Sequence, residues 1–116
     1  MSYDVYLCDP VSREVLHAES PHLIYGGTYV MGGTTKPWLN ITYNYAKPYD
    51  AHHFSIRDLD GKNALDMLPE VERVISELGD DVDADYWNPT EGNAKRALVQ
   101  LRTLMKMRPD AVIEVH

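Results

Sequence analysis

The residues best suited to hold a metal are two neighbouring histidines, His52 and His53, close in the chain to Asp50, Asp58 and Asp60. Imidazole and carboxylate groups are common ligands of zinc and other transition metals. Adjacent residues of a strand point to opposite faces, however, and no two histidines stand four residues apart on a predicted helix. The spacing therefore predicts no metal site. A small metal-dependent hydrolase that uses His52 or His53 stays open as an alternative.

The other candidates for catalysis have simpler interpretations. Cys8 lies in a β-prone segment without an activating partner, which indicates core packing. Asp58 and Asp60 flank Gly61 in a predicted turn. The segment GGTYVMGG resembles a phosphate-binding loop only in composition, because no Lys-Ser/Thr pair that opens a helix follows it. The sequence predicts no catalytic residue and no cofactor, and it favours a protein that is not an enzyme.

A different kind of chemistry is suggested by the stretch WLNITYNY, which alternates apolar and polar residues as a strand does. One face of that strand should be buried and consists of Leu39, Ile41, Tyr43 and Tyr45. The other face consists of Trp38, Asn40, Thr42 and Asn44. A tryptophan, two carboxamides and a hydroxyl in one row could bind a base, a sugar or a peptide, with Asn93 added from a helix N-terminus that favours anions. Cross-strand hydrogen bonding on a solvated sheet face is the competing interpretation.

A second candidate surface is the acidic segment before the last predicted helix. Its members are Asp80, Asp81, Asp83 and Asp85, followed by Tyr86. A run of like charges is usually a solvated loop. The alternative is that these carboxylates meet a basic protein surface, in the way that a nucleic-acid mimic would. Tyr86 and Trp87 could add aromatic contact area, although Trp87 also fits a hydrophobic staple.

Composition limits the classes of function. The chain has 116 residues, a net charge of −7 and a pI near 5.0, which argues against nucleic-acid binding because phosphate contacts need basic residues. Residues 1–116 have the length and the apolar content of one globular domain. With one cysteine, no disulfide framework forms within the chain. No apolar run predicts a signal peptide or a membrane span, so we expect a cytoplasmic protein, with a homodimer left open.

Strand signals fill the first half of the chain. Residue alternation predicts strands over Tyr3–Cys8, Glu14–Ala18, Thr28–Met31 and Trp38–Tyr45. Gly-Gly pairs bracket the third of these segments and indicate tight turns. The Lys47-Pro48 pair is expected to end the fourth.

Helix signals fill the second half. Asn63 is a predicted cap, followed by a short turn at 63–67 and a helix from about Pro69, or by one kinked helix. Gly79 is expected to end that helix in a left-handed conformation. The next helix should begin with Asn88 as the N-cap, Pro89 in the first position and Glu91 reaching back to the cap. Its predicted apolar stripe consists of Ala94, Ala97, Leu98, Leu101 and Met105.

A closing strand is expected over Ala111–Val115, after Pro109 ends the last helix. The element order β-β-β-β-α-α-β predicts an α+β fold. In that fold, a mainly antiparallel sheet of about five strands carries two helices packed on one face.

Several segments resemble a family of small uncharacterised proteins of phages, prophages and scattered bacterial and archaeal genomes. The resemblance rests on GGTYVMGGTT, LNITYNY, IRDLDGKNALDMLP, the segment Asp83–Trp87, EGNAKRAL and RPDAVIEVH. It implies no catalytic or binding residue. It implies a setting, because small acidic phage products often act by binding host factors.

The leading hypothesis is a non-catalytic binding protein of phage or mobile-element type that interferes with a host protein or defence component in the host cytoplasm. The alternative is a module that sequesters a nucleotide-derived small molecule on the Trp38 row.

Overall fold

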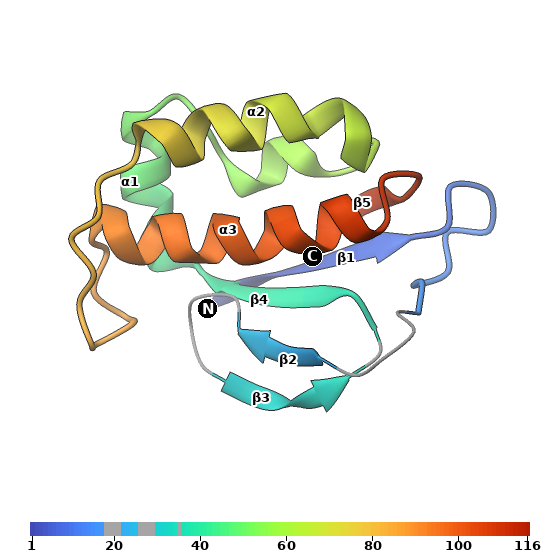
Figure 1. Ribbon diagram of the computed structural model, residues 1–116, viewed down its shortest axis with the longest axis horizontal. Coiled ribbons are helices and arrows are strands. Elements are labelled where there is room, and N and C mark those ends of the chain that lie inside the picture. The colour runs from blue at the N-terminus through green and yellow to red at the C-terminus, as the bar shows by residue number, and fades with distance from the viewer. Residues whose placement is uncertain (18–21, 26–29, 35) are drawn as a thin grey trace.

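The computed structural model describes residues 1–17, 22–25, 30–34 and 36–116. The fold is a mixed α+β fold with a three-stranded antiparallel sheet and three helices (Figure 1). Strand β1 (Ser2–Cys8) is the central strand, between β4 (Trp38–Thr42) and β5 (Val112–Val115). A separate antiparallel hairpin of β2 (His22–Tyr25) and β3 (Val30–Thr34) lies beside β4. The predicted class is therefore confirmed, whereas a single five-stranded sheet with two helices is not.

The outer edge of β5 is covered by the chain segment before α2. Gly61 N donates to Ile113 O at 2.8 Å, and Ile113 N donates to Lys62 O at 2.8 Å. The carboxylate of Asp60 accepts a hydrogen bond from Val115 N at 2.9 Å. Because these bonds use the free polar groups of the strand, this edge is closed to pairing with another chain.

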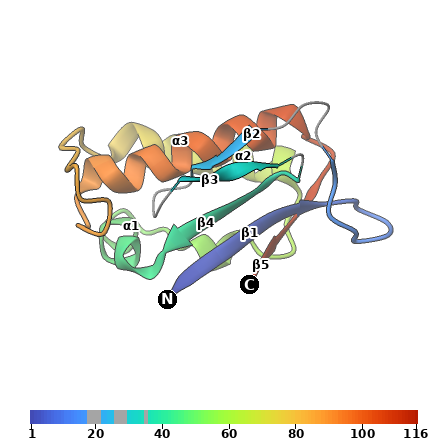
Figure 2. The same cartoon turned by 90° about the horizontal axis from the view of Figure 1, so that it is seen from below.

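Helices α2 (Ala64–Glu77) and α3 (Glu91–Met107) pack on one face of the sheet, as Figure 2 shows. The predicted stripe of α3, including Leu98 and Leu101, is buried with the inward side chains of β1, Val5 and Leu7. Asn63 caps α2 as predicted, since its side chain accepts a hydrogen bond from Asp66 N. Residues 64–77 form one continuous helix with Pro69 inside it, which excludes a helix that starts only at Pro69.

The predicted strand Trp38–Tyr45 is too long by three residues. The chain leaves the sheet after Thr42 and forms a 3₁₀ helix, η1 (Tyr43–Tyr45), then α1 (Ala46–Ala51). The hydroxyl of Thr42 accepts from Asn44 N at 3.2 Å, which caps the 3₁₀ turn. Pro48 falls in the first turn of α1, where a missing N–H is tolerated, so Lys47-Pro48 lies within a helix and does not end a strand.

Other predicted boundaries also change. Glu14–Ala18 forms no strand over its described residues and contributes one isolated bridge, Cys8 to Val15; Ala18 lies outside the described residues. Residues 28–29 of the predicted third strand also lie outside, and β2 was not predicted. Between β4 and α2, a further 3₁₀ helix, η2 (Ile56–Leu59), begins at a capping box formed by Ser55 and Asp58.

Both predicted caps around the loop between α2 and α3 are wrong. Helix α2 ends at Glu77, its C-cap Leu78 has an extended conformation, and the φ of Gly79 is not positive. Helix α3 is capped by Thr90, whose hydroxyl accepts from Asn93 N at 3.1 Å, and Asn88 stands outside the helix. Glu91 is the first residue of α3, and its carboxylate accepts from Gly79 N at 2.8 Å.

Candidate functional site

Two members of the predicted polar row do lie together on the outer face of the sheet. Trp38 stacks on Tyr6 of β1, with ring centroids 5.6 Å apart and planes inclined by 19°. The amide of Asn40 donates to Ser2 Oγ at 2.7 Å and to Asp4 Oδ1 at 2.8 Å. Cross-strand contacts are what the competing interpretation predicted, but Asn40 is buried at 7% exposure and not solvated.

The other two members do not extend an accessible row, because Thr42 is the last residue of β4 and Asn44 lies beyond the strand. The side chain of Thr42 is buried and caps η1, so it does not line an accessible face. Asn44 belongs to η1, and its exposed amide donates to Trp87 O at 2.8 Å. The prediction of four side chains in one row is therefore wrong. Asn44 continues the strand pattern in the sequence but lies outside the sheet, where it binds a loop more than forty positions away.

Asn93, the fifth predicted ligand residue, is buried at 2% exposure near the start of α3. Its Oδ1 accepts from Asp83 N at 3.0 Å. Its Nδ2 donates to Asp85 O at 3.1 Å and to Asn88 O at 2.9 Å. Because both ends of the carboxamide bind the preceding loop, this side chain holds the loop in place and does not face a ligand.

The loop between α2 and α3, residues 78–90, is hereafter the α2–α3 loop. Most of its carboxylates accept hydrogen bonds from the loop or from the first turn of α3. Asp81 accepts from Gly92 N, Asp83 from Asp85 N and from the Asn88 amide, and Asp85 from Trp87 N. The bonds from Asp85 N and the Asn88 amide hold the pKa of Asp83 below its usual value. Asp80 forms an ion pair with Lys95. The acidic segment is thus part of an ordered loop.

The tip of this loop is fastened by its backbone. The hydroxyl of Tyr45 donates to Tyr86 O at 2.6 Å, and the Asn44 amide binds the next carbonyl, that of Trp87. Burial raises the pKa of Tyr45 to about 12, so its hydroxyl keeps the proton that it donates. The side chains of Tyr86 and Trp87 stay 37% and 44% exposed, with ring centroids 5.0 Å apart. This exposed pair is hereafter called the aromatic tip.

The base of the loop lies directly against α3. A Cβ built on Gly92 would stand 2.6 Å from both Asp81 C and Val82 N, closer than a Cβ atom can approach these backbone atoms. Glycine at this position therefore permits the loop to cross the helix. Val82, which is 52% exposed, then borders a shallow depression of about 220 Å³ that Lys95, Arg96 and Val99 also line.

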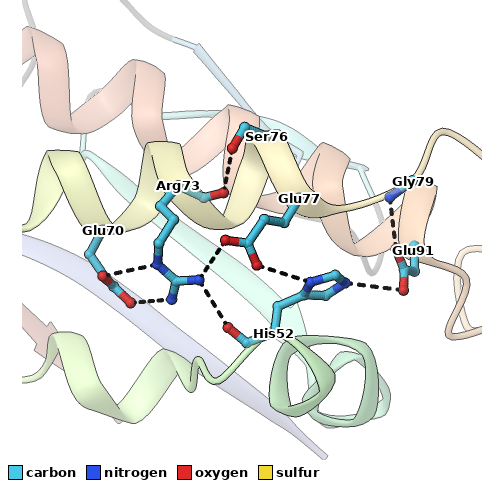
Figure 3. A network of polar contacts seen from close by, with 7 residues as sticks. All are labelled: His52, Glu70, Arg73, Ser76, Glu77, Gly79 and Glu91. Atoms are coloured by element: carbon cyan, nitrogen blue, oxygen red, sulfur yellow. Dashed lines mark hydrogen bonds and ion pairs between the residues drawn. The ribbon is translucent and has the colours of Figure 1, made fainter.

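His52 lies in a polar network that joins three helices (Figure 3). Its Nδ1 is 3.3 Å from Glu77 Oε1 of α2, and its Nε2 is 3.1 Å from Glu91 Oε2 of α3. Arg73 Nη1 donates to Glu77 Oε2 at 2.9 Å and to the backbone oxygen of His52 at 3.2 Å. Sequence reasoning missed this network, because its members come from three helices and only Glu70, Arg73 and Glu77 of α2 show helical spacing.

The histidine and carboxylate side chains considered as metal ligands are not arranged as a metal site. Within the described ranges, no group of three or more His, Cys, Asp or Glu side chains could hold an ion. His52 faces Glu77 and Glu91, and Asp58 caps η2. Cys8 is buried, and burial together with a hydrogen bond to Glu114 raises the pKa of its thiol to about 12. A thiol in that state is a poor nucleophile near neutral pH.

Comparisons with protein-family models, with curated proteins and with solved structures found no match to this chain. None of the helices in the described part of the chain combines the length and the apolar character that a membrane crossing needs. The feature of the described residues that bears most directly on function is therefore the geometry of the α2–α3 loop and its aromatic tip.

Proposed function

We propose that this protein is a non-catalytic binding protein whose main contact surface is the α2–α3 loop with its aromatic tip. The observation that carries the proposal is the combination of a fastened backbone and exposed aromatic side chains. Tyr45 and Asn44 bind the carbonyls of Tyr86 and Trp87, while the two aromatic side chains face solvent.

Such a surface suits protein recognition for a physical reason. Tyrosine and tryptophan are enriched among the residues that contribute most to protein–protein affinity, because each provides a large contact area with few rotatable bonds. Ordering a loop on binding costs free energy, and a loop already held by hydrogen bonds avoids most of that cost. Asn93 and Gly92 of α3 hold the base of the loop, and Tyr45 and Asn44 of η1 hold its tip.

The proposed partner is a host protein or a component of host defence. Support for this class comes from the resemblance of the sequence segments to phage and prophage proteins, whose small acidic members often act on host factors. The carboxylates around the tip would favour a partner with basic groups at the rim of the contact. Because Asp83 and Asp85 accept hydrogen bonds from the loop backbone and Asp81 accepts one from Gly92 N of α3, reversing their charge would disturb the loop itself. The aromatic tip offers the cleaner test.

The experiment places a photo-crosslinking amino acid at position 87 and exposes the protein to a lysate of the host cell. The matched control places the same group at Leu65 of α2, which is also highly exposed (59%). We expect a discrete crosslinked partner from position 87 and none shared with position 65. Excess wild-type protein should compete for that partner.

A double variant, Tyr86→Ala with Trp87→Ala, provides the second arm. Each truncation of a central aromatic contact typically weakens binding by about tenfold or more, so the double variant should compete poorly. The carbonyl groups that fasten the loop are unchanged in this variant, and its thermal unfolding should match that of the wild type. Equal competition by the folded double variant would refute the aromatic tip as the contact surface.

A further inference from the structure

His52 is held by carboxylates on both of its ring nitrogens. Glu77 of α2 faces Nδ1, and Glu91 of α3 faces Nε2, while His52 itself is the residue that follows α1 (Figure 3). A neutral imidazole has one N–H donor and one acceptor nitrogen. Only the protonated ring can donate to both carboxylates. In the neutral ring, one nitrogen lone pair would face a carboxylate oxygen.

The two carboxylates do not depend on His52 alone. The second oxygen of Glu91 accepts from Gly79 N at 2.8 Å, and the second oxygen of Glu77 accepts from Arg73 at 2.9 Å. When the imidazole loses its proton, both carboxylates keep these partners. The contact that weakens is therefore the attachment of the end of α1 to α2 and α3. Arg73 keeps its bond to the backbone oxygen of His52, so α1 loosens without detaching.

The end of α1 is connected to the aromatic tip through a short path. Helix α1 follows η1 directly, and η1 contains Asn44 and Tyr45, which fasten the tip. Glu77 and Glu91 stand at the two ends of the α2–α3 loop. His52 thus connects two parts of the structure. One is the segment η1–α1, which binds the aromatic tip, and the other is the pair of helices α2 and α3, between which the loop runs.

We propose that His52 is a pH-operated latch, which as imidazolium locks α1 to α2 and α3 and thereby holds the aromatic tip in its ordered arrangement. Loss of the proton loosens the end of α1 and lets the α2–α3 loop open more often. Its role in recognition rests on the proposed contact surface, because an ordered tip binds at lower cost than a mobile one.

The direction of the pH dependence follows from the contacts. The hydrogen bond to Glu91, assisted by the one to Glu77, raises the pKa of His52 above its ordinary value of 6.5. A raised pKa in the folded state means that the stabilisation is fully present below the unfolded value. It is lost as the pH rises through the folded value. The charged groups that face the ring or its backbone are Glu77 and Arg73 from α2 and Glu91 from α3.

The test measures amide hydrogen exchange on the free protein, corrected for intrinsic rates, at about pH 6 and about pH 8, on either side of the imidazole titration. In the wild type, we expect protection of residues 52–54 and of the α2–α3 loop to fall several-fold at the higher pH. The fall should follow the same midpoint as the ring signals of His52 in an NMR titration. His52→Gln should show low protection that does not change with pH.

His53→Asn is the matched control, because asparagine tolerates the positive φ of 57° at that position and the variant keeps His52. It should respond to pH as the wild type does. If His52→Gln fails to fold, Glu91→Gln keeps an oxygen for Gly79 N but removes the charge beside the ring, and it should move the response to lower pH. Wild-type protection without a pH response, or an unchanged response in the folded His52 or Glu91 variant, would overturn the latch.

This experiment needs no partner, so it separates the latch from the proposed function. Protection that responds to pH in a protein without any crosslinked partner would leave the latch standing and refute the contact surface. Crosslinking at position 87 with pH-independent protection would do the reverse.

Discussion

Replacing Asn93 with alanine tests whether this side chain is the internal support of the α2–α3 loop. The change removes a carboxamide that is almost fully buried and bonded to three backbone groups, Asp83 N, Asp85 O and Asn88 O. Alanine is a better helix former than asparagine, so helix propensity alone predicts a small gain in stability. The contacts predict a loss.

The size of that loss follows from the hydrogen bonds. Each contributes about 1 kcal/mol net, so the three together correspond to about 3 kcal/mol. Water can reach Asp85 and Asn88, which are exposed, and would recover part of this. We expect the free energy of unfolding to fall by about 2 to 3 kcal/mol, which lowers Tm by roughly 10 °C in a domain of this size. The amides of Asp83 and Gly92 should also exchange much faster than in the wild type.

Asn93→Asp sharpens the test because two physical effects oppose each other. The new carboxylate would stand in the first turn of α3, where the helix dipole usually stabilises a negative charge by about 0.3 to 1 kcal/mol. The same carboxylate would face the oxygens of Asp85 and Asn88, to which the Asn93 amide donates in the wild type. We expect Asn93→Asp to be at least as unstable as Asn93→Ala.

Chemical denaturation followed by circular dichroism gives both free energies, and hydrogen exchange reports on the loop. A loss below about 0.5 kcal/mol for Asn93→Ala, the range of an ordinary surface substitution, would refute the support role. So would a stabilised Asn93→Asp variant. Either result would make Asn93 a candidate ligand residue again.

Three further variants test other parts of the fold by denaturation. Gly92→Ala should destabilise the protein by about 1 to 3 kcal/mol, because the new Cβ meets the backbone of segment 80–82. Helix propensity alone predicts a gain in stability, so an equally stable variant would disprove this close approach. Pro69→Ala should stabilise by about 1 to 2 kcal/mol, since proline removes a hydrogen-bond donor inside α2; a loss of stability would contradict that account. Tyr49→Phe should cost about 1 kcal/mol through the lost bond to the Ala94 carbonyl, and no cost would show that this buried bond contributes nothing.

Helix α3 and the strands β1 and β5 were predictable because local pattern and tertiary environment agree there. The apolar spacing from Ala94 to Met105 matches the helical period, and that stripe is buried. Val5 and Leu7 alternate with Asp4 and Tyr6, and β1 keeps one face inward. In these elements, burial of the apolar face contributes the largest favourable free energy, and the hydrophobic periodicity of the sequence shows which face that is.

The residues at the ends of elements were harder to predict because several of them suit two roles. Asn88 and Thr90 are both good N-caps by type. The structure uses Thr90, while Asn88 binds Asp83 and Asn93 inside the loop. The pattern in WLNITYNY likewise continues past Thr42 although the strand does not. Tyr45 there meets a carbonyl 41 residues away, a partner that no local pattern reveals.

The candidate site shows the same division. Sequence drew attention to the α2–α3 loop through its charge and through Tyr86, both of which are visible in composition and order. It could not show that most of the carboxylates organise the loop, or that Asn44 and Asn93 serve the loop instead of a ligand. Those roles depend on which backbone groups come within hydrogen-bonding distance.

The sequence by itself determined the α+β class, the buried faces of β1 and α3, and the acidic character of the loop, because periodicity, side-chain polarity and charge are properties of the chain. Only the tertiary structure decided the end of β4, the caps of α2 and α3, the pairing of His52 with Glu77 and Glu91, and the exposure of the aromatic tip. Each of these depends on hydrogen bonds between residues far apart in the chain, and short-range patterns carry no record of such partners.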